Sequence, residues 1–276
     1  MRFGISTHLY HDRKLNREHL AQVAAYGFES IELFATRSHF DYHDPAAVAA
    51  LSGWLKETGV ALHSMHAPIA DGFVNGQWRG VYSNASADLA ARQAAVRETE
   101  TALQVAATIR AQVLVVHLGT PSAAGGTNHH GAAAKSAEEI CRLAEPLGVR
   151  VAFEVIPNEL STPSALVELL DRDLEAKHAG ICLDFGHAKL LGDVPDAVET
   201  VAEHLIATHV HDNHGREDEH LAPYLGDINW NTALVTMQKI GYDGTYLMEL
   251  ANTGSPAAVL EEARRARQRF ERTLAS

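Results

Sequence analysis

The sequence predicts an α/β protein, a single (β/α)8 TIM barrel, and three observations favour this fold. Strand-like apolar runs alternate with helix-like segments along all 276 residues, which is typical of βα units around a parallel sheet. Several helical segments are followed at once by a glycine, the residue that most readily ends a helix in the left-handed conformation. The length is close to the usual size of such a barrel, about 250 residues. A doubly wound open sheet is the alternative fold.

The expected elements follow from these patterns. The strands are expected at residues 3–6, 30–34, 61–66, 113–117, 150–154, 180–184, 206–210 and 245–249. The clearest helices are expected at residues 15–26, 45–58, 132–147 and 230–240, each followed by a glycine: Gly27, Gly59, Gly148 and Gly241. Because no linker or shift in composition interrupts the repeat, we expect one domain over residues 1–276.

The longest stretches without a regular pattern are residues 67–86, 118–131 and 212–229. Each follows a strand, so each is expected on the face where barrel enzymes keep their active sites. Loops of this length are usually functional, and we expect substrate recognition there. His129 and His130 are interpreted as part of a polar loop tip rather than as metal ligands.

The composition argues against several classes of partner. The net charge is −12, and the one basic run, residues 264–272, is expected to be a solvated helix face, so binding to nucleic acid is not expected. No apolar stretch approaches the roughly 18 residues of a membrane span, and no signal-peptide pattern precedes the first strand. A cytoplasmic location is therefore expected, with Cys141 and Cys182 as buried thiols. The sequence leaves open whether the barrel forms a homo-oligomer.

Acids and imidazoles end five of the predicted strands: His117, Glu154, Asp184, His209 and Glu249. The carboxyl ends of barrel strands converge on one mouth, so these side chains are expected to meet. Buried together, carboxylates repel one another unless a cation neutralises them. Glu154, Asp184, His209 and Glu249 are therefore predicted to bind one divalent metal, Mn²⁺, Mg²⁺, Co²⁺ or Zn²⁺.

Two of these acids are also candidates for catalysis. Glu154 and Glu249 lie on the fifth and eighth predicted strands and would approach a bound substrate from different sides. Such a pair can remove a proton from a carbon next to a carbonyl and return it elsewhere, while a metal stabilises the enediolate. That is the chemistry of isomerases and epimerases. The alternative is that one or both are structural acids in salt bridges.

Further polar residues lie near the predicted mouth. His187 follows Asp184 in an AspPheGlyHis segment, and strand alternation turns His211 the same way as His209. Additional metal ligands are possible at His66, His117, His187, Asp218 and His220. For each of these the alternative is an ordinary polar residue of a strand end or surface loop.

The segments ValAlaPheGlu, CysLeuAspPheGlyHis, HisValHisAspAsn and LeuMetGluLeu resemble the xylose-isomerase-like TIM-barrel superfamily. This superfamily covers sugar isomerases and epimerases of the tagatose/psicose 3-epimerase and inosose isomerase type, together with endonuclease IV. The resemblance implies a metal site at Glu154, Asp184, His209 and Glu249, with the two glutamates as the acid/base pair. It also implies substrate contacts from His187 and Arg216, although the spacing of Arg216 from His209 differs from the family pattern. We expect His211 to bind substrate hydroxyls as well.

The resemblance leaves three activities open. The first is a metal-dependent isomerase or epimerase acting on a small sugar or keto-sugar. The second is a zinc phosphodiesterase of endonuclease IV type acting on abasic DNA, which would use up to three zinc ions and the full ligand set. The third is a metal-dependent lyase or dehydratase of keto-sugars or keto-inositols. The acidic charge and the opening segment IleSerThrHisLeuTyr favour the first.

Overall fold

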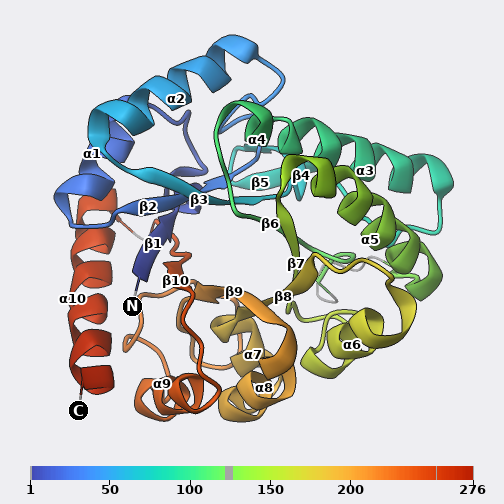
Figure 1. The fold of residues 1–276 in the computed structure, drawn as a ribbon. Coiled ribbons are helices and arrows are strands. Elements are labelled where there is room, and N and C mark those ends of the chain that lie inside the picture. The colour runs from blue at the N-terminus through green and yellow to red at the C-terminus, as the bar shows by residue number, and fades with distance from the viewer. Residues whose placement is uncertain (1, 122–126, 253, 276) are drawn as a thin grey trace.

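The computed structural model describes residues 2–121, 127–252 and 254–275, in which parallel strands form a closed barrel (Figure 1). Hydrogen bonds run from each strand to the next in the order β1, β2, β3, β6, β7, β8, β9, β10 and back to β1. The barrel strands are β1 (Arg2–Ser6), β2 (Ser30–Phe34), β3 (Ala61–His66), β6 (Val113–Val116), β7 (Arg150–Glu154), β8 (Ala179–Asp184), β9 (Leu205–Val210) and β10 (Thr245–Met248). The predicted (β/α)8 barrel is confirmed.

Helices surround the barrel (Figure 1). They are α1 (Arg17–Ala25), α2 (Pro45–Thr58), α3 (Leu89–Leu103), α4 (Val105–Thr108), α5 (His130–Ala144), α6 (Pro163–Glu168), α7 (Phe185–Leu191), α8 (Val194–Val201), α9 (Trp230–Lys239) and α10 (Pro256–Ala275). The four predicted terminal glycines have φ between 66° and 84°, the region that glycine adopts without strain. They let the chain turn directly from helix to strand.

The last helix packs against the start of the barrel, beside α1 (Figure 1). Phe270 of α10 is fully buried, and its ring centroid lies 6.3 Å from that of Phe3 in β1. In the basic run, Arg264 and Arg265 pair with Glu261, whereas Arg267 lies over the ring of Phe3. Both cysteines are free and buried, as predicted. Among the described residues, no helix is both long enough and apolar enough to cross a membrane.

Two predicted loops differ from expectation. Residues 67–86 contain an antiparallel hairpin, β4 (Ala70–Val74) and β5 (Gln77–Val81), where only irregular structure was expected. In the segment 118–131, α5 already begins at His130, with His129 at its N-cap, so these histidines are not a loop tip. Residues 122–126 of that segment lie outside the described residues.

Candidate metal centre

Four predicted ligands meet at the carboxyl end of the barrel. Glu154 and Asp184 are the last residues of β7 and β8, His209 lies near the end of β9, and Glu249 follows β10. Parallel register places these ends at one height, since Asp184 lies beside His209 across β8 and β9. All four side chains are buried, and one potential ligand atom from each lies within 4.8 Å of the others. The convergence predicted from the strand ends is therefore present.

The Nδ1 atom of His209 lies at the centre of this inner cluster (Glu154, Asp184, His209 and Glu249). It is 3.0 Å from a carboxylate oxygen of Glu154, 3.4 Å from Glu249 and 3.9 Å from Asp184. Three carboxylates and one imidazole form an oxygen-rich donor set. Such a set suits Mn²⁺, Mg²⁺ or Co²⁺ and is acceptable to Zn²⁺.

Glu32 on β2 is a site residue that the sequence interpretation missed. Its carboxylate is fully buried, accepts hydrogen bonds from Ser6 and Ser64, and lies 3.1 Å from Nε2 of His209. Holding the second nitrogen of a ligand histidine fixes its ring orientation. A signal existed in SerIleGluLeuPhe, because a charge inside an apolar strand must have a buried partner.

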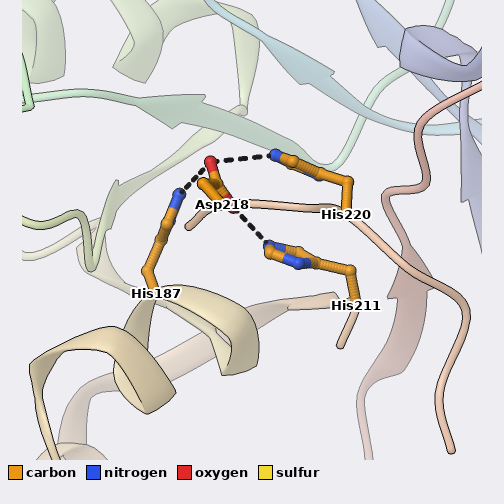
Figure 2. A group of neighbouring side chains, drawn as sticks. All are labelled: His187, His211, Asp218 and His220. Atoms are coloured by element: carbon orange, nitrogen blue, oxygen red, sulfur yellow. Dashed lines mark hydrogen bonds and ion pairs between the residues drawn. The ribbon is translucent and has the colours of Figure 1, made fainter. Parts of the chain in front are cut away.

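Two further groups of potential ligands adjoin the inner cluster. His66 and His117 both direct Nε2 at one oxygen of Glu154, at 3.1 and 2.9 Å. The outer cluster consists of His187, His211, Asp218 and His220 (Figure 2). There the Asp218 carboxylate lies 3.1 Å from His187 and 3.2 Å from His220. The structure thus brings together every residue predicted as an additional ligand.

Backbone carbonyls orient three of these imidazoles. Nδ1 of His66 donates to the carbonyl of Ala67, Nδ1 of His187 to Val155, and Nδ1 of His220 to Glu249. Each ring therefore directs Nε2 toward a carboxylate. A carbonyl on one nitrogen, with the second nitrogen directed into a group of carboxylates, is an arrangement common in metal-binding histidines, and the residues present fit divalent ions.

The electrostatics favour a cation at the mouth. Burial alone would lower the pKa of His66, but its hydrogen bond to Glu154 and the charges of Glu154, Glu249 and Glu32 raise it to about 9. The pKa of His220 is likewise raised to about 9 against the effect of burial, chiefly by Asp218. These raised pKa values favour protonated imidazoles beside the carboxylates of the mouth, and a divalent ion would supply the same neutralisation.

The loop after β9 carries three of the four outer-cluster residues, His211, Asp218 and His220, and is held by Asp212. The buried carboxylate of Asp212 accepts hydrogen bonds from the backbone of Asn213, Tyr224 and Ile228 and from the indole of Trp230. A carboxylate with this many donors fixes the loop on both sides of Asp218 and His220. The segment is therefore ordered although it lacks regular secondary structure.

The predicted substrate contacts lie in different places. His187 borders the cavity above the inner cluster. His211 is fully buried behind the cavity, 3.0 Å from Asp184 and stacked on His220 at 4.0 Å. Gly186 leaves room for that ring, since a Cβ there would lie 1.9 Å from it. Arg216 is exposed on the loop and outside the cavity lining, so substrate contacts from His211 and Arg216 stay predictions.

The cavity at the mouth has a volume of about 270 Å³, at the lower end for small-molecule sites. Glu154 and Glu249 line its floor, together with His66, His117, His187, Asp218 and His220. The hairpin β4–β5 contributes to its wall through Ala70, Trp78 and Val81. Among the described residues that line it, none is lysine or arginine.

A closed parallel barrel with acids and imidazoles at the carboxyl ends of its strands has the arrangement in which barrel enzymes carry their active sites. The chain belongs to the xylose isomerase-like TIM barrel family, whose model matches residues 20–270. An uncharacterized protein of Methanocaldococcus jannaschii is 28% identical over 264 residues, covering 91% of this chain and 84% of the relative.

Solved structures agree with this assignment. A D-tagatose 3-epimerase-like protein superposes with a TM-score of 0.81 at 26% identity, covering 100% of this chain and 97% of the other. The IOLI protein with a bound zinc atom superposes with a TM-score of 0.77 at 15% identity, covering 98% of both chains. The second comparison supports the fold alone.

Proposed function

We propose that this protein is a divalent-metal-dependent isomerase or epimerase of a small sugar or keto-sugar. The observation that carries the proposal is the pair Glu154 and Glu249, which border one cavity from β7 and β10 and share a buried imidazole, His209. Membership of the xylose isomerase-like family and similarity to a D-tagatose 3-epimerase-like protein support the substrate class.

The two glutamates would exchange a proton with the substrate. One carboxylate removes the proton from the carbon beside a carbonyl, and the C–H electron pair forms the double bond of an enediolate while the carbonyl oxygen takes the negative charge. The other, in its acid form, returns a proton to a different face or carbon. A divalent ion held by Glu154, Asp184, His209 and Glu249 would supply stabilisation for that oxygen charge. His187, which borders the cavity, would bind a substrate hydroxyl.

Solvent deuterium exchange tests the proposal directly. Protein loaded with Mn²⁺, Co²⁺, Mg²⁺ or Zn²⁺ is incubated in D₂O with ketoses, inososes and keto-glycosides, and exchange is followed by NMR. We expect deuterium at the carbon beside the carbonyl, together with an isomerised or epimerised product. An unsaturated product that lacks a substituent would instead indicate the lyase or dehydratase, which shares the first step. No exchange with any of these substrates would contradict the proposal.

One observation favours a second function, the zinc phosphodiesterase of endonuclease IV type. The described residues form four partly overlapping groups that could each hold an ion, and the outer cluster shares no member with the other three, so the mouth has donors for more than one ion. The net charge of −12 and the absence of lysine and arginine from the described cavity lining count against DNA. Elemental analysis separates the two functions: about one ion per chain supports the isomerase. About three zinc ions, with cleavage of abasic DNA that His117→Ala abolishes, would support the phosphodiesterase.

A further inference from the structure

The hairpin β4–β5, which is labelled in Figure 1, lines part of the cavity with Ala70, Trp78 and Val81. Its turn is Asn75–Gly76, both with positive φ, the residue pair best suited to a two-residue hairpin turn. Two contacts attach the hairpin to the segment after β2: Phe73 donates its backbone N–H to Ser38, and Asp71 pairs with Arg37 at 3.1 Å. The hairpin is therefore a fixed part of the cavity wall.

Trp78 is the centre of an aromatic group on this hairpin. Its ring centroid lies 4.8 Å from Phe73, 5.3 Å from His11 and 5.8 Å from Phe34. Phe34 in turn lies 5.2 Å from His66, whose Nε2 faces Glu154. Two rings, those of Phe34 and His66, thus connect Trp78 to the carboxylate of Glu154.

The two ends of the cavity differ in chemistry. Acids and imidazoles from the strand ends line one part of the cavity, whereas the hairpin and the residues that flank it, here called the hairpin end, contribute Ile69, Ala70, Trp78, Val81 and Tyr82. Burying a hydroxyl without a hydrogen-bond partner costs about 1–3 kcal/mol. A free sugar has a hydroxyl on nearly every carbon, so it matches the floor but not the hairpin end. Val81 is 59% exposed, so the hairpin end opens to solvent and can accept a group longer than the sugar.

We propose that the preferred substrate is an O-alkyl or O-aryl glycoside of a keto-sugar, with the sugar on the floor and an uncharged apolar aglycone against Trp78 and Val81. The inference rests on the proposed function and adds the substrate class to it. A phosphorylated sugar is disfavoured, because the described cavity lining offers no lysine or arginine to the phosphate.

The test compares substrates that differ only in the aglycone. We use 3-keto-glucose, methyl 3-keto-glucoside and phenyl 3-keto-glucoside, and measure kcat/KM for deuterium exchange with the metal-loaded protein. We expect phenyl 3-keto-glucoside to exceed 3-keto-glucose by roughly tenfold or more, since stacking on an aromatic ring adds to the burial of apolar area. Equal values for the three substrates would overturn the inference while leaving the proposed function intact.

The hairpin also offers a matched pair of variants. Val81 lines the cavity, whereas Val74 is on the same hairpin, is 49% exposed and does not line it. We expect Val81→Ser to reduce the preference for the phenyl glycoside about threefold and Trp78→Ala to reduce it about tenfold. Val74→Ser should leave the preference unchanged. If Val81→Ser and Val74→Ser behave alike, the aglycone does not contact the hairpin and the inference fails.

A binding measurement separates this inference from the proposed function. If no keto-sugar exchanges deuterium, the proposed function fails, and saturation-transfer NMR with phenyl glucoside and methyl glucoside then decides whether the apolar end is a ligand site. Stronger saturation of the phenyl ring in wild type than in Trp78→Ala supports the site. Equal saturation in the two proteins overturns it.

Discussion

His39 and His66 are both buried near the carboxyl end of the barrel, but their pKa values move in opposite directions. Burial lowers the pKa of His39 to about 4. Its Nδ1 donates to the carbonyl of Arg13, and its Nε2 has no hydrogen-bond partner among the described residues. His66 is equally buried, yet Glu154 and the neighbouring acids raise its pKa to about 9.

The difference shows that burial alone does not set the charge of a histidine in this barrel. Around His39 only backbone carbonyls oppose the loss of water, and they do not outweigh it, so the neutral ring is favoured. At the mouth, carboxylates from several strand ends outweigh the same loss. The strand-end acids thus create a region whose negative charge must be balanced by protons or by a metal. This property distinguishes the mouth around His66 from the surroundings of His39.

The largest effect should come from removing an acid that borders the cavity. Glu249→Gln retains the shape and burial of the side chain but cannot exchange a proton, and general acid–base catalysis contributes about 10²–10⁴-fold. We expect kcat to fall at least 10³-fold with an unchanged circular dichroism spectrum. A rate near that of wild type would remove Glu249 from the proposed mechanism.

The buried, neutral His39 predicts that the free energy of unfolding falls in acid. The pKa of His39 is about 4 in the folded protein and 6.5 in the unfolded chain, so the unfolded chain binds a proton first as the pH falls. The contribution of neutral His39 to the free energy of unfolding is complete above pH 6.5. It is lost as the pH falls toward 4, by up to about 3 kcal/mol. Urea unfolding between pH 7.5 and 4.5 measures this loss.

His39→Gln isolates the contribution, because glutamine can still donate to the Arg13 carbonyl but does not titrate. We expect the variant to lose less stability than wild type over the same pH range. His129→Gln is the control, since His129 is exposed. A pH dependence that is the same in wild type and in His39→Gln would show that His39 is not kept neutral by burial.

Metal removal tests the proposed metal site at the mouth of the barrel. Stripping the protein with a chelator leaves Glu154, Asp184 and Glu249 without a cation, so the folded state should lose stability and activity together. Adding back Mn²⁺ at about 100 times its dissociation constant should restore about 2.7 kcal/mol. Differential scanning calorimetry measures the change. An unfolding temperature that does not respond to chelator or to Mn²⁺ would contradict the assignment of this cluster as a metal site.

The strand ends were predictable from sequence because each apolar run stops at a polar residue that parallel register then places at the mouth. Glu32 was not predictable in the same way, since it lies inside its strand and its partner His209 is distant in sequence. The stacking of His211 on His220 depends on the path of the loop after β9, which Asp212 sets through tertiary hydrogen bonds. The hairpin β4–β5 had a local signal, Asn75–Gly76 between PheVal and GlnTrp, that was interpreted as irregular structure.

The smallest effect should come from changing Glu32, which acts on the inner cluster through the ring of His209. Glu32→Gln keeps one oxygen, which can accept from either Ser6 or Ser64, but it removes the charge that holds Nε2 of His209. Changes of this kind typically lower metal affinity by about 10–100-fold. Isothermal titration of the metal-free protein with Mn²⁺ measures the affinity, and Glu29→Gln, three residues away and exposed, is the control. If Glu32→Gln binds Mn²⁺ as wild type does, the role of Glu32 is limited to packing between β1, β2 and β3.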